Sequence, residues 1–206
     1  MRADGYFVAL EGGDGAGKST QARLLADALR GAGREVLLTR QPGGTRLGGQ
    51  LRELVLHGDH MAPRAEVLLF AADKAQHVAE VIAPALAAGQ VVITDRYVDS
   101  AVAYQGAARG LGADEVHRLQ LWAVDDLIPD LTIVIDLPEA QGRQRRGVVH
   151  DRLESEDDAF HAAVRAHFVA MAHGNPLRYL LLDGMAAADQ LHAAILQRLR
   201  ADGVIT

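Results

Sequence analysis

A glycine-rich stretch ending in lysine and serine is the first part of the sequence that could do chemistry. Residues 12–19 match the pattern G-x-x-x-x-G-K-[ST], with Lys18 and Ser19 in its last two places. Glycine lets such a loop curl until its backbone N–H groups point at phosphate oxygens. Lys18 can bridge the β- and γ-phosphates of a nucleoside triphosphate, and the Ser19 hydroxyl can bind Mg²⁺. The predicted phosphate cradle consists of Gly12, Gly13, Asp14, Gly15, Ala16, Gly17, Lys18, Ser19 and Thr20.

This pattern predicts a nucleoside triphosphate and Mg²⁺, but it does not separate a kinase from a GTPase switch or an ATPase motor. An incidental glycine-rich turn is the alternative, and the order of apolar run, loop and amphipathic segment argues against it. GTP-binding switches carry an N-K-x-D motif that reads guanine, and the sequence lacks one. The remaining motifs must therefore decide the reaction.

Charged residues directly follow two of the apolar runs. Arg40 ends one run, and a guanidinium at that place can hold a phosphate in bidentate fashion. The turn that begins at Pro42 could form a pocket wall; a solvated loop residue is the alternative for Arg40. Asp95 and Arg96 end another run, where the aspartate can hold Mg²⁺ or its water and the arginine can neutralise phosphate charge. A purely structural ion pair between Asp95 and Arg96 is the alternative there.

Two pairs of residues could recognise a base. Phe70 and Lys74 are four apart in a helix-like segment and so share a face, where an aromatic ring and a cation could meet a base. Taken alone, a core phenylalanine beside a surface lysine is the simpler explanation. Tyr104 offers a ring and a hydroxyl, and the amide of Gln105 could read a base edge with one donor and one acceptor.

A basic segment follows the fourth apolar run. Its glycines, Gly142 and Gly147, predict a hinged lid that closes over the triphosphate and brings guanidinium groups to the transferring phosphoryl group. A solvated basic helix end is the alternative. The arginines of this segment are Arg143, Arg145, Arg146 and Arg152.

The elements that must position these residues alternate between strand and helix. Five short apolar runs indicate buried parallel strands at 6–10, 36–39, 91–94, 131–135 and 179–182. Helices are predicted after the glycine-rich loop, over 67–88 with a kink or break at Pro84, and near 113–125, 157–173 and 186–200. This alternation predicts an α/β fold with a doubly wound parallel sheet, whose ligands bind at the carboxyl ends of the strands.

Composition narrows the class further. The 206 residues suit one domain, and a net charge of −6 disfavours nucleic-acid binding. The sequence has no cysteine, and its first apolar run is too short for a membrane span, so we expect a cytoplasmic protein with no membrane partner. The 9 histidines show no metal-binding spacing, and we expect His57, His60 and His77 on surfaces or helix faces.

From about Tyr6 to the last predicted helix, the sequence resembles bacterial thymidylate kinases. The segments that carry the resemblance are residues 11–20, 39–45, 95–97, 103–106 and 151–154. It implies a P-loop nucleoside monophosphate kinase that phosphorylates dTMP to dTDP with ATP and Mg²⁺, a step in dTTP synthesis. It also implies a five-stranded sheet of order 2-3-1-4-5 flanked by helices, a single domain over 1–206 with a short lid at about 142–153, and a homodimer.

The resemblance also implies roles for single residues. Asp14 would meet the deoxyribose 3′-hydroxyl, and Arg40 and Arg96 would hold the acceptor phosphate. Tyr104 would pack near the sugar and disfavour a 2′-hydroxyl. Around thymine, Phe70 would stack with Pro42 nearby, while the base edges would be met by Lys74, Ser100 and Gln105.

Members of this family place a catalytic arginine either in the P-loop or in the lid. Gly15 stands at the P-loop position, so this chain resembles the lid-arginine type, with Arg146 and Arg152 as the favoured candidates. Two residues depart from the family pattern: Gln41 replaces the usual glutamate, and Lys74 the usual arginine. The lysine loses a planar fork and the glutamine a charge. The main rival is a small kinase for another nucleotide or nucleoside, and a catalytically dead relative is a further alternative.

Overall fold

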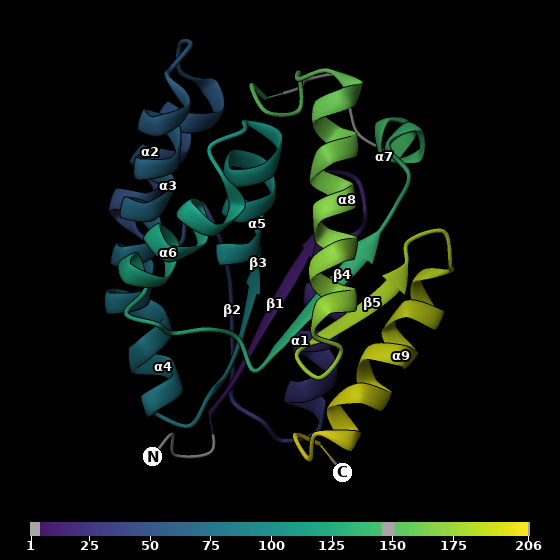
Figure 1. The fold of residues 1–206 in the computed structure, drawn as a ribbon. Helices are drawn as coiled ribbons and strands as arrows, with labels where there is room; N and C mark the ends of the chain where they lie inside the picture. The colour runs from purple at the N-terminus through teal and green to yellow at the C-terminus, as the bar shows by residue number, and fades with distance from the viewer. Residues whose placement is uncertain (1–4, 146–150, 206) are drawn as a thin grey trace.

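Five parallel strands form the centre of the molecule, in the order β2-β3-β1-β4-β5. The computed structural model describes residues 5–145 and 151–205 (Figure 1). The predicted strands are confirmed and run slightly further at their carboxyl ends. Their bounds are β1 Tyr6–Gly12, β2 Val36–Arg40, β3 Val91–Asp95, β4 Leu131–Asp136 and β5 Tyr179–Asp183.

Helices cover both faces of the sheet. One face is buried under α1 (Lys18–Gly31) and α9 (Ala188–Ala201), which contribute leucines such as Leu25 and Leu199 to the core. The remaining helices lie on the opposite face (Figure 1). They are α2 Arg46–His57, α3 Pro63–His77, α4 Ala83–Ala87, α5 Val98–Ala101, α6 Ala113–Ala123 and α8 Asp158–Gly174. The short α7 (Glu139–Arg145) follows β4.

The helix predicted over 67–88 is longer and less regular than expected. It begins as α3 at Pro63, continues as the π-helix η1 (Val78–Ile82) and ends as α4. Pro84 occupies the first turn of α4, where a missing backbone N–H is tolerated. A second π-helix, η2 (Val102–Ala108), extends α5 and carries residues of the site. Such widened turns occur often at functional positions.

Helix α2 was not predicted, because Gly48 and Gly49 near its start are poor helix formers. The Thr45 side chain accepts a hydrogen bond from the Gly48 backbone N–H and so caps the helix. A Cβ added at Gly48 would lie 2.4 Å from Oδ1 of Asp73 on α3. Glycine is therefore required for the close approach of α2 to α3, although it is a poor helix former.

Candidate active site

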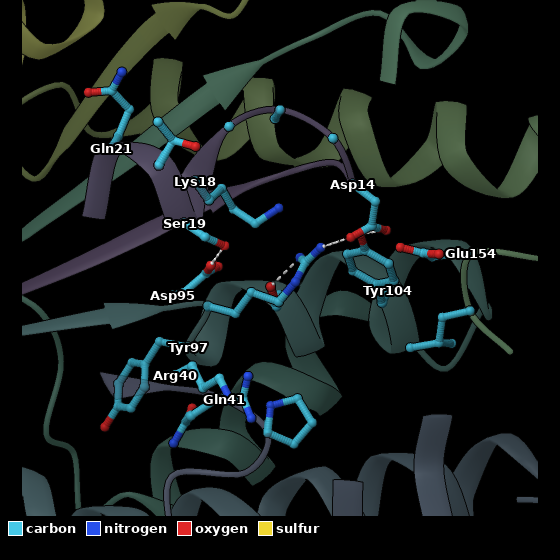
Figure 2. A pocket seen from close by; sticks show the side chains of 18 of the residues that line it. Asp14, Lys18, Ser19, Gln21, Arg40, Gln41, Asp95, Tyr97, Tyr104 and Glu154 are labelled. Carbon is cyan, nitrogen blue, oxygen red and sulfur yellow. Dashed lines mark hydrogen bonds and ion pairs between the residues drawn. The ribbon is translucent and has the colours of Figure 1, made fainter. Parts of the chain in front are cut away.

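A cleft of about 890 Å³ opens at the carboxyl ends of β1, β2 and β3 (Figure 2). This is the edge at which ligands bind in open parallel sheets. Its lining joins the glycine-rich loop to segments from all parts of the chain. Predicted site residues in the lining are Asp14 to Thr20, Arg40, Pro42, Phe70, Lys74, Asp95, Arg96, Ser100, Tyr104 and Gln105.

The glycine-rich loop between β1 and α1 has the geometry of a phosphate cradle. Gly12 and Gly17 have φ values of 133° and 97°, which side-chain-bearing residues rarely adopt. The Lys18 ammonium is almost fully buried and donates to the carbonyl oxygens of Gly12 at 3.1 Å and Gly13 at 2.7 Å. Burial and the nearby Arg96 lower the pKa of Lys18. The loop thus holds a cation in a region that favours anions.

Ser19 and Asp95 meet at the start of α1. The Ser19 hydroxyl donates to a carboxylate oxygen of Asp95, which ends β3 (Figure 2). A hydroxyl and a carboxylate in contact beside a phosphate cradle supply the oxygen ligands that Mg²⁺ prefers. Within the described parts of the chain, no group of three or more His, Cys, Asp or Glu residues could hold a metal by itself. The two residues predicted to hold Mg²⁺ are therefore in contact beside the glycine-rich loop, and their role as ligands stays a prediction.

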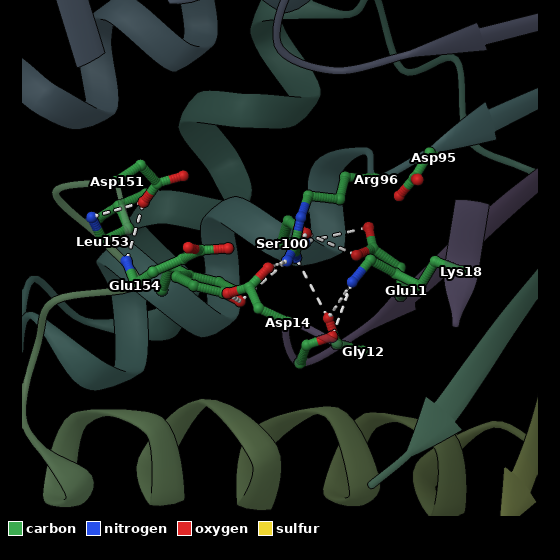
Figure 3. Close-up of polar contacts among 12 residues, drawn as sticks. Glu11, Gly12, Asp14, Lys18, Asp95, Arg96, Ser100, Asp151, Leu153 and Glu154 are labelled. Atoms are coloured by element: carbon green, nitrogen blue, oxygen red, sulfur yellow. Dashed lines mark hydrogen bonds and ion pairs between the residues drawn. The ribbon is translucent and has the colours of Figure 1, made fainter. Parts of the chain in front are cut away.

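Arg96 connects the glycine-rich loop to the middle of the cleft. Its backbone has a φ of 70°, a conformation that is costly for arginine and that occurs mainly at functional sites. The guanidinium donates to the Gly12 carbonyl oxygen at 3.2 Å and to the Ser100 hydroxyl at 3.0 Å. It also forms a salt bridge with Asp14, not with its sequence neighbour Asp95 (Figure 3). The structural ion pair considered from the sequence is thus not formed.

Asp14 and Tyr104 complete this arrangement. The Tyr104 hydroxyl donates to Asp14 at 3.1 Å and accepts from Arg96 at 3.0 Å. Burial opposes the negative charge of Asp14, but Arg96 and Lys18 outweigh it and hold the pKa of Asp14 well below its ordinary value. Asp14 is therefore a permanent anion and a strong hydrogen-bond acceptor at neutral pH.

Glu11, which sequence reasoning missed, supports Arg96 from behind. Its fully buried carboxyl group accepts the backbone N–H group of Tyr97 at 2.8 Å. It also accepts the backbone N–H group of Ser100 at 3.1 Å, and Glu11 and Ser100 lie beside each other in Figure 3. It also accepts the Ser100 hydroxyl at 2.6 Å. Burial, with a contribution from Asp99, raises the pKa of Glu11 to about 7. Because Ser100 donates to Glu11 and accepts from Arg96, its hydroxyl orients the guanidinium.

The end of β2 brings a second group of cations to the cleft. Arg40 is exposed there. The next two residues, Gln41 and Pro42, are joined by a cis peptide bond. Arg52 on α2 also lines the cleft and donates to the Pro42 carbonyl oxygen at 3.1 Å. Burial and the neighbouring Arg40 lower the pKa of Arg52. Sequence reasoning missed Arg52 because it lies on the unpredicted helix α2.

His77 lies on a face of helix α3, one of the two kinds of position expected for it, and anchors this segment to α3. It is fully buried, and burial lowers its pKa to about 4, so its ring is neutral. The Gln41 side-chain amide donates to Nδ1 at 2.9 Å, and Nε2 lies 2.8 Å from the Thr39 hydroxyl. The residues on either side of Arg40 are therefore both fixed to one helix.

Phe70 and Lys74 share one face of α3, as their spacing predicted. Phe70 and Lys74 both line the cleft, and the Lys74 ammonium lies 5.4 Å from the centre of the Phe70 ring. Lys74 is only 2% exposed, so it is not the surface lysine considered from the sequence. Burial lowers the pKa of Lys74 to about 8. This face is thus largely apolar, with one buried cation.

The predicted lid has three differently placed parts. On α7, Arg145 lines the cleft and donates to the Gly184 carbonyl oxygen at 3.1 Å, whereas Arg143 pairs with Asp158 on the surface. Arg146 lies outside the described residues. Arg152 is not among the residues that line the cleft, and it donates to the Val55 carbonyl oxygen at 2.7 Å. It also forms a salt bridge with the Glu66 carboxylate at 2.5 Å.

Gly142 is not the hinge that the sequence suggested. It is a buried residue inside α7, and a Cβ added to it would lie 2.5 Å from the Asp14 carbonyl oxygen. A Cβ on Gly15 would in turn lie 2.5 Å from the Gly142 carbonyl oxygen. The two glycines thus allow α7 to pack directly on the glycine-rich loop.

A P-loop with a buried lysine shares one cleft with a group of arginines and an aromatic wall, and this arrangement defines a P-loop kinase of small nucleotides. The thymidylate kinase family model matches residues 10–195. The chain belongs to the thymidylate kinase family, and its reaction is the ATP-dependent phosphorylation of dTMP to dTDP, a step in nucleotide biosynthesis.

Individual relatives agree over nearly the whole chain. A thymidylate kinase of Leifsonia xyli is 55% identical, covering 97% of this chain and 95% of that protein. One from Cutibacterium acnes is 49% identical over 94% of this chain and 96% of its own length. The crystal structure of thymidylate kinase from Ehrlichia chaffeensis superposes with a TM-score of 0.76 at 31% identity, covering 95% of this chain and 98% of that one.

No helix in the described ranges is both long and apolar enough to cross a membrane.

Proposed function

We propose that ATP and dTMP bind at opposite ends of the cleft, with their phosphates meeting at Arg96. The observation that carries this proposal is the position of Arg96, whose guanidinium contacts Gly12 and Asp14 of the P-loop as well as Tyr104 from η2. A cation at that place can neutralise charge between donor and acceptor phosphates. The acceptor phosphate is already anionic, so no general base is needed.

The donor end consists of the P-loop and the segment between β5 and α9. Residues 12–20 would hold the ATP phosphates, with Lys18 on the β- and γ-phosphates. Beyond the P-loop the cleft is lined by Met185, Ala186 and Leu191, a mainly apolar surface that suits the flat face of adenine. Arg145, which bonds to Gly184 beside this segment, is placed to contact the ATP phosphates.

Ser19 and Asp95 would hold Mg²⁺, because they bring a hydroxyl and a carboxylate together next to the cradle. When bound, the ion would neutralise charge on the phosphates. A site with few protein ligands suits Mg²⁺, which keeps several waters and substrate oxygens in its coordination shell.

The acceptor end would hold dTMP through three groups of contacts. Arg40 and Arg96 would bind its phosphate, with Arg52 as an additional cation that the lining of the cleft suggests. Asp14 would accept from the 3′-hydroxyl, and the ring of Tyr104 would close the space beside C2′. Thymine would stack on Phe70 near Pro42, with Lys74 and Gln105 at its edge. Ser100 is bonded to Glu11 and Arg96, which supports a role in orienting Arg96 and not in contacting the base.

We divide the lid arginines by their contacts. Arg152 is held by Glu66 and the Val55 carbonyl oxygen, which supports an anchoring role at the end of the lid (about 142–153). That Arg146 contacts the transferring phosphoryl group stays a prediction. We further propose that residues 1–206 form one domain.

We also propose that the protein is cytoplasmic, since its phosphoryl donor ATP is present in the cytoplasm. We further propose that it forms a homodimer. Three large apolar side chains are exposed on neighbouring helices: Leu54 on α2 is 53% exposed, Leu68 on α3 is 55% and Trp122 on α6 is 81%. These helices lie together on one side of the molecule (Figure 1). Light scattering should give twice the monomer mass, and Leu68→Glu should reduce it to that of the monomer.

The experiment that tests the reaction is an acceptor panel. With ATP and Mg²⁺, the protein should phosphorylate dTMP faster than dUMP, UMP, AMP, GMP or thymidine. Brisk phosphorylation of another acceptor with dTMP left untouched would reduce the assignment to a P-loop kinase of different specificity. ADP release without any acceptor preference would point to an ATPase.

A further inference from the structure

A buried carboxylate lies behind the base-recognition end of the cleft and takes no part in the phosphate chemistry. Glu66, in the first turn of α3, is fully buried. Its carboxylate accepts the Gln105 side-chain amide at 2.8 Å and two guanidinium groups, those of Arg152 at 2.5 Å and Arg109 at 3.4 Å. It therefore joins α3, η2 and the end of the lid in one cluster.

This contact fixes the direction of the Gln105 amide. A carboxylate paired with two guanidinium groups can only accept hydrogen bonds, so the amide must turn its NH₂ group toward Glu66. The amide oxygen is then the end left for the cleft, which Gln105 lines. Gln105 is 1% exposed, so the side chain has little room for another arrangement. The cleft is thus given an acceptor and not a donor at this place.

The neighbours of Glu66 are themselves restrained. Arg109 forms a second salt bridge with Glu156 at 2.6 Å and stacks on the Phe160 ring, 4.9 Å from its centre. Arg152 is held by the Val55 carbonyl oxygen. The two arginines balance the charges of the two glutamates, and both arginines have further contacts that hold them in place beside Glu66.

We propose that Glu66 is a positioning residue for base selection: by fixing the Gln105 amide, it makes the site demand a ring N–H donor at N3 of the base. The proposal rests on dTMP binding with its base at this end of the cleft. Thymine offers an N3–H donor and an O4 acceptor, which match the Gln105 oxygen and the Lys74 ammonium. Cytosine reverses both, with an acceptor at N3 and an amino donor at C4. The N3 acceptor of cytosine would face the Gln105 oxygen, which is also an acceptor. Its C4 amino donor would face the Lys74 ammonium, which is also a donor.

Glu66→Gln tests this assignment, because an amide at position 66 can accept or donate and so lets Gln105 turn over. The measurement is kcat/KM for dTMP, dUMP and dCMP with ATP. We expect the dTMP-to-dCMP ratio to fall by about tenfold, the effect of one hydrogen bond. The dTMP-to-dUMP ratio should stay constant, because both bases carry N3–H. Ratios cancel any general loss of turnover.

Glu156→Gln is the matched control. It removes the same charge from the same cluster but does not touch Gln105, so the dTMP-to-dCMP ratio should match that of the unaltered protein. If Glu66→Gln does not fold, the double variant Glu66→Gln/Arg152→Gln keeps the cluster neutral and should show the same tenfold fall. A folded Glu66 variant whose ratio stays within twofold of the original, or a Glu156 variant whose ratio falls equally, overturns the proposal. Failure of the unaltered protein to prefer dTMP would instead overturn the proposed function.

Discussion

The side-chain amide of Gln41, which stands where glutamate is usual in the family, donates to Nδ1 of His77. With the Gln41 amide as donor, Nδ1 of the neutral imidazole accepts. A carboxylate at position 41 would instead draw a proton to Nδ1, and its negative charge would favour the imidazolium over the neutral ring. Gln41→Glu should therefore raise the pKa of His77 from about 4 to above 6.5. NMR titration of the imidazole protons measures this change.

Thr39→Val is the control for the His77 titration. It removes the other hydrogen bond of the ring without adding charge, so the pKa of His77 should stay low. An unchanged His77 titration in the Gln41→Glu variant would show that the two side chains are not paired in solution.

The pKa of about 8 at Lys74 predicts a pH-dependent affinity for dTMP. The ammonium is charged below pH 8 and loses its charge above it, which weakens a hydrogen bond to O4 of thymine. We expect the KM for dTMP to rise by roughly fivefold as the pH rises from 7 to 9.5. Lys74→Arg restores the residue usual in the family, stays charged throughout this range and should abolish most of the rise.

Comparing the KM of the unaltered protein with that of the Lys74→Arg variant separates the titration of Lys74 from that of other groups. Ionisation of thymine itself affects the KM of both proteins equally. An identical rise in KM for the lysine and arginine proteins would therefore remove Lys74 from base recognition.

Glu11 should make stability depend on pH. Below pH 4.5 the carboxyl is protonated in both folded and unfolded chains, and its contribution to stability is then fully present. As the pH rises toward 7, the unfolded chain ionises first and this contribution is lost. The shift from 4.5 to about 7 corresponds to about 3 kcal/mol in the free energy of unfolding.

Glu11→Gln does not titrate, so its stability relative to the unaltered protein should increase by up to about 3 kcal/mol between pH 4 and pH 8. Urea unfolding at each pH measures the difference. Glu115→Gln on the exposed surface of α6 serves as the control for general pH effects. A difference that is constant across this range would mean that Glu11 ionises as readily in the folded chain as in the unfolded one.

Lys18→Ala should lower turnover by about 10³-fold or more, because the P-loop loses the only side-chain cation it carries. The fold should persist, since Lys18 bonds only to backbone carbonyl oxygens of the loop. Steady-state kinetics and circular dichroism test the two parts separately. Near-normal turnover in a folded variant would refute the assigned role.

Asp14→Asn should raise the KM for dTMP more than that for ATP. The amide keeps the shape of the side chain but loses the charge that pairs with Arg96. The same charge would strengthen the hydrogen bond proposed with the sugar hydroxyl. Steady-state measurements with each substrate varied in turn give both constants. An unchanged KM for dTMP would argue against the contact with the sugar.

The sequence predicted the sheet and the phosphate cradle well, because both depend on local patterns. Apolar runs identify buried strands, and glycine spacing identifies the P-loop. The contribution of Glu11, Arg52 and Glu66 was missed, because each acts through partners far away in the chain. Helix α2 was missed for a similar reason. Gly48 is a poor helix former, and it is needed because α2 approaches Asp73 on α3 closely at this position. Long-range contacts of this kind leave no periodic signal.

The direct packing of Gly15 against Gly142 has a consequence for how this chain could change over time. Any side chain at position 15, an arginine included, would collide with the backbone of α7. A P-loop arginine at this position would therefore need a coordinated displacement of the segment after β4. A single mutation at position 15 would disrupt the packing of α7 before it supplied a new cation, so this contact opposes a P-loop arginine in this chain.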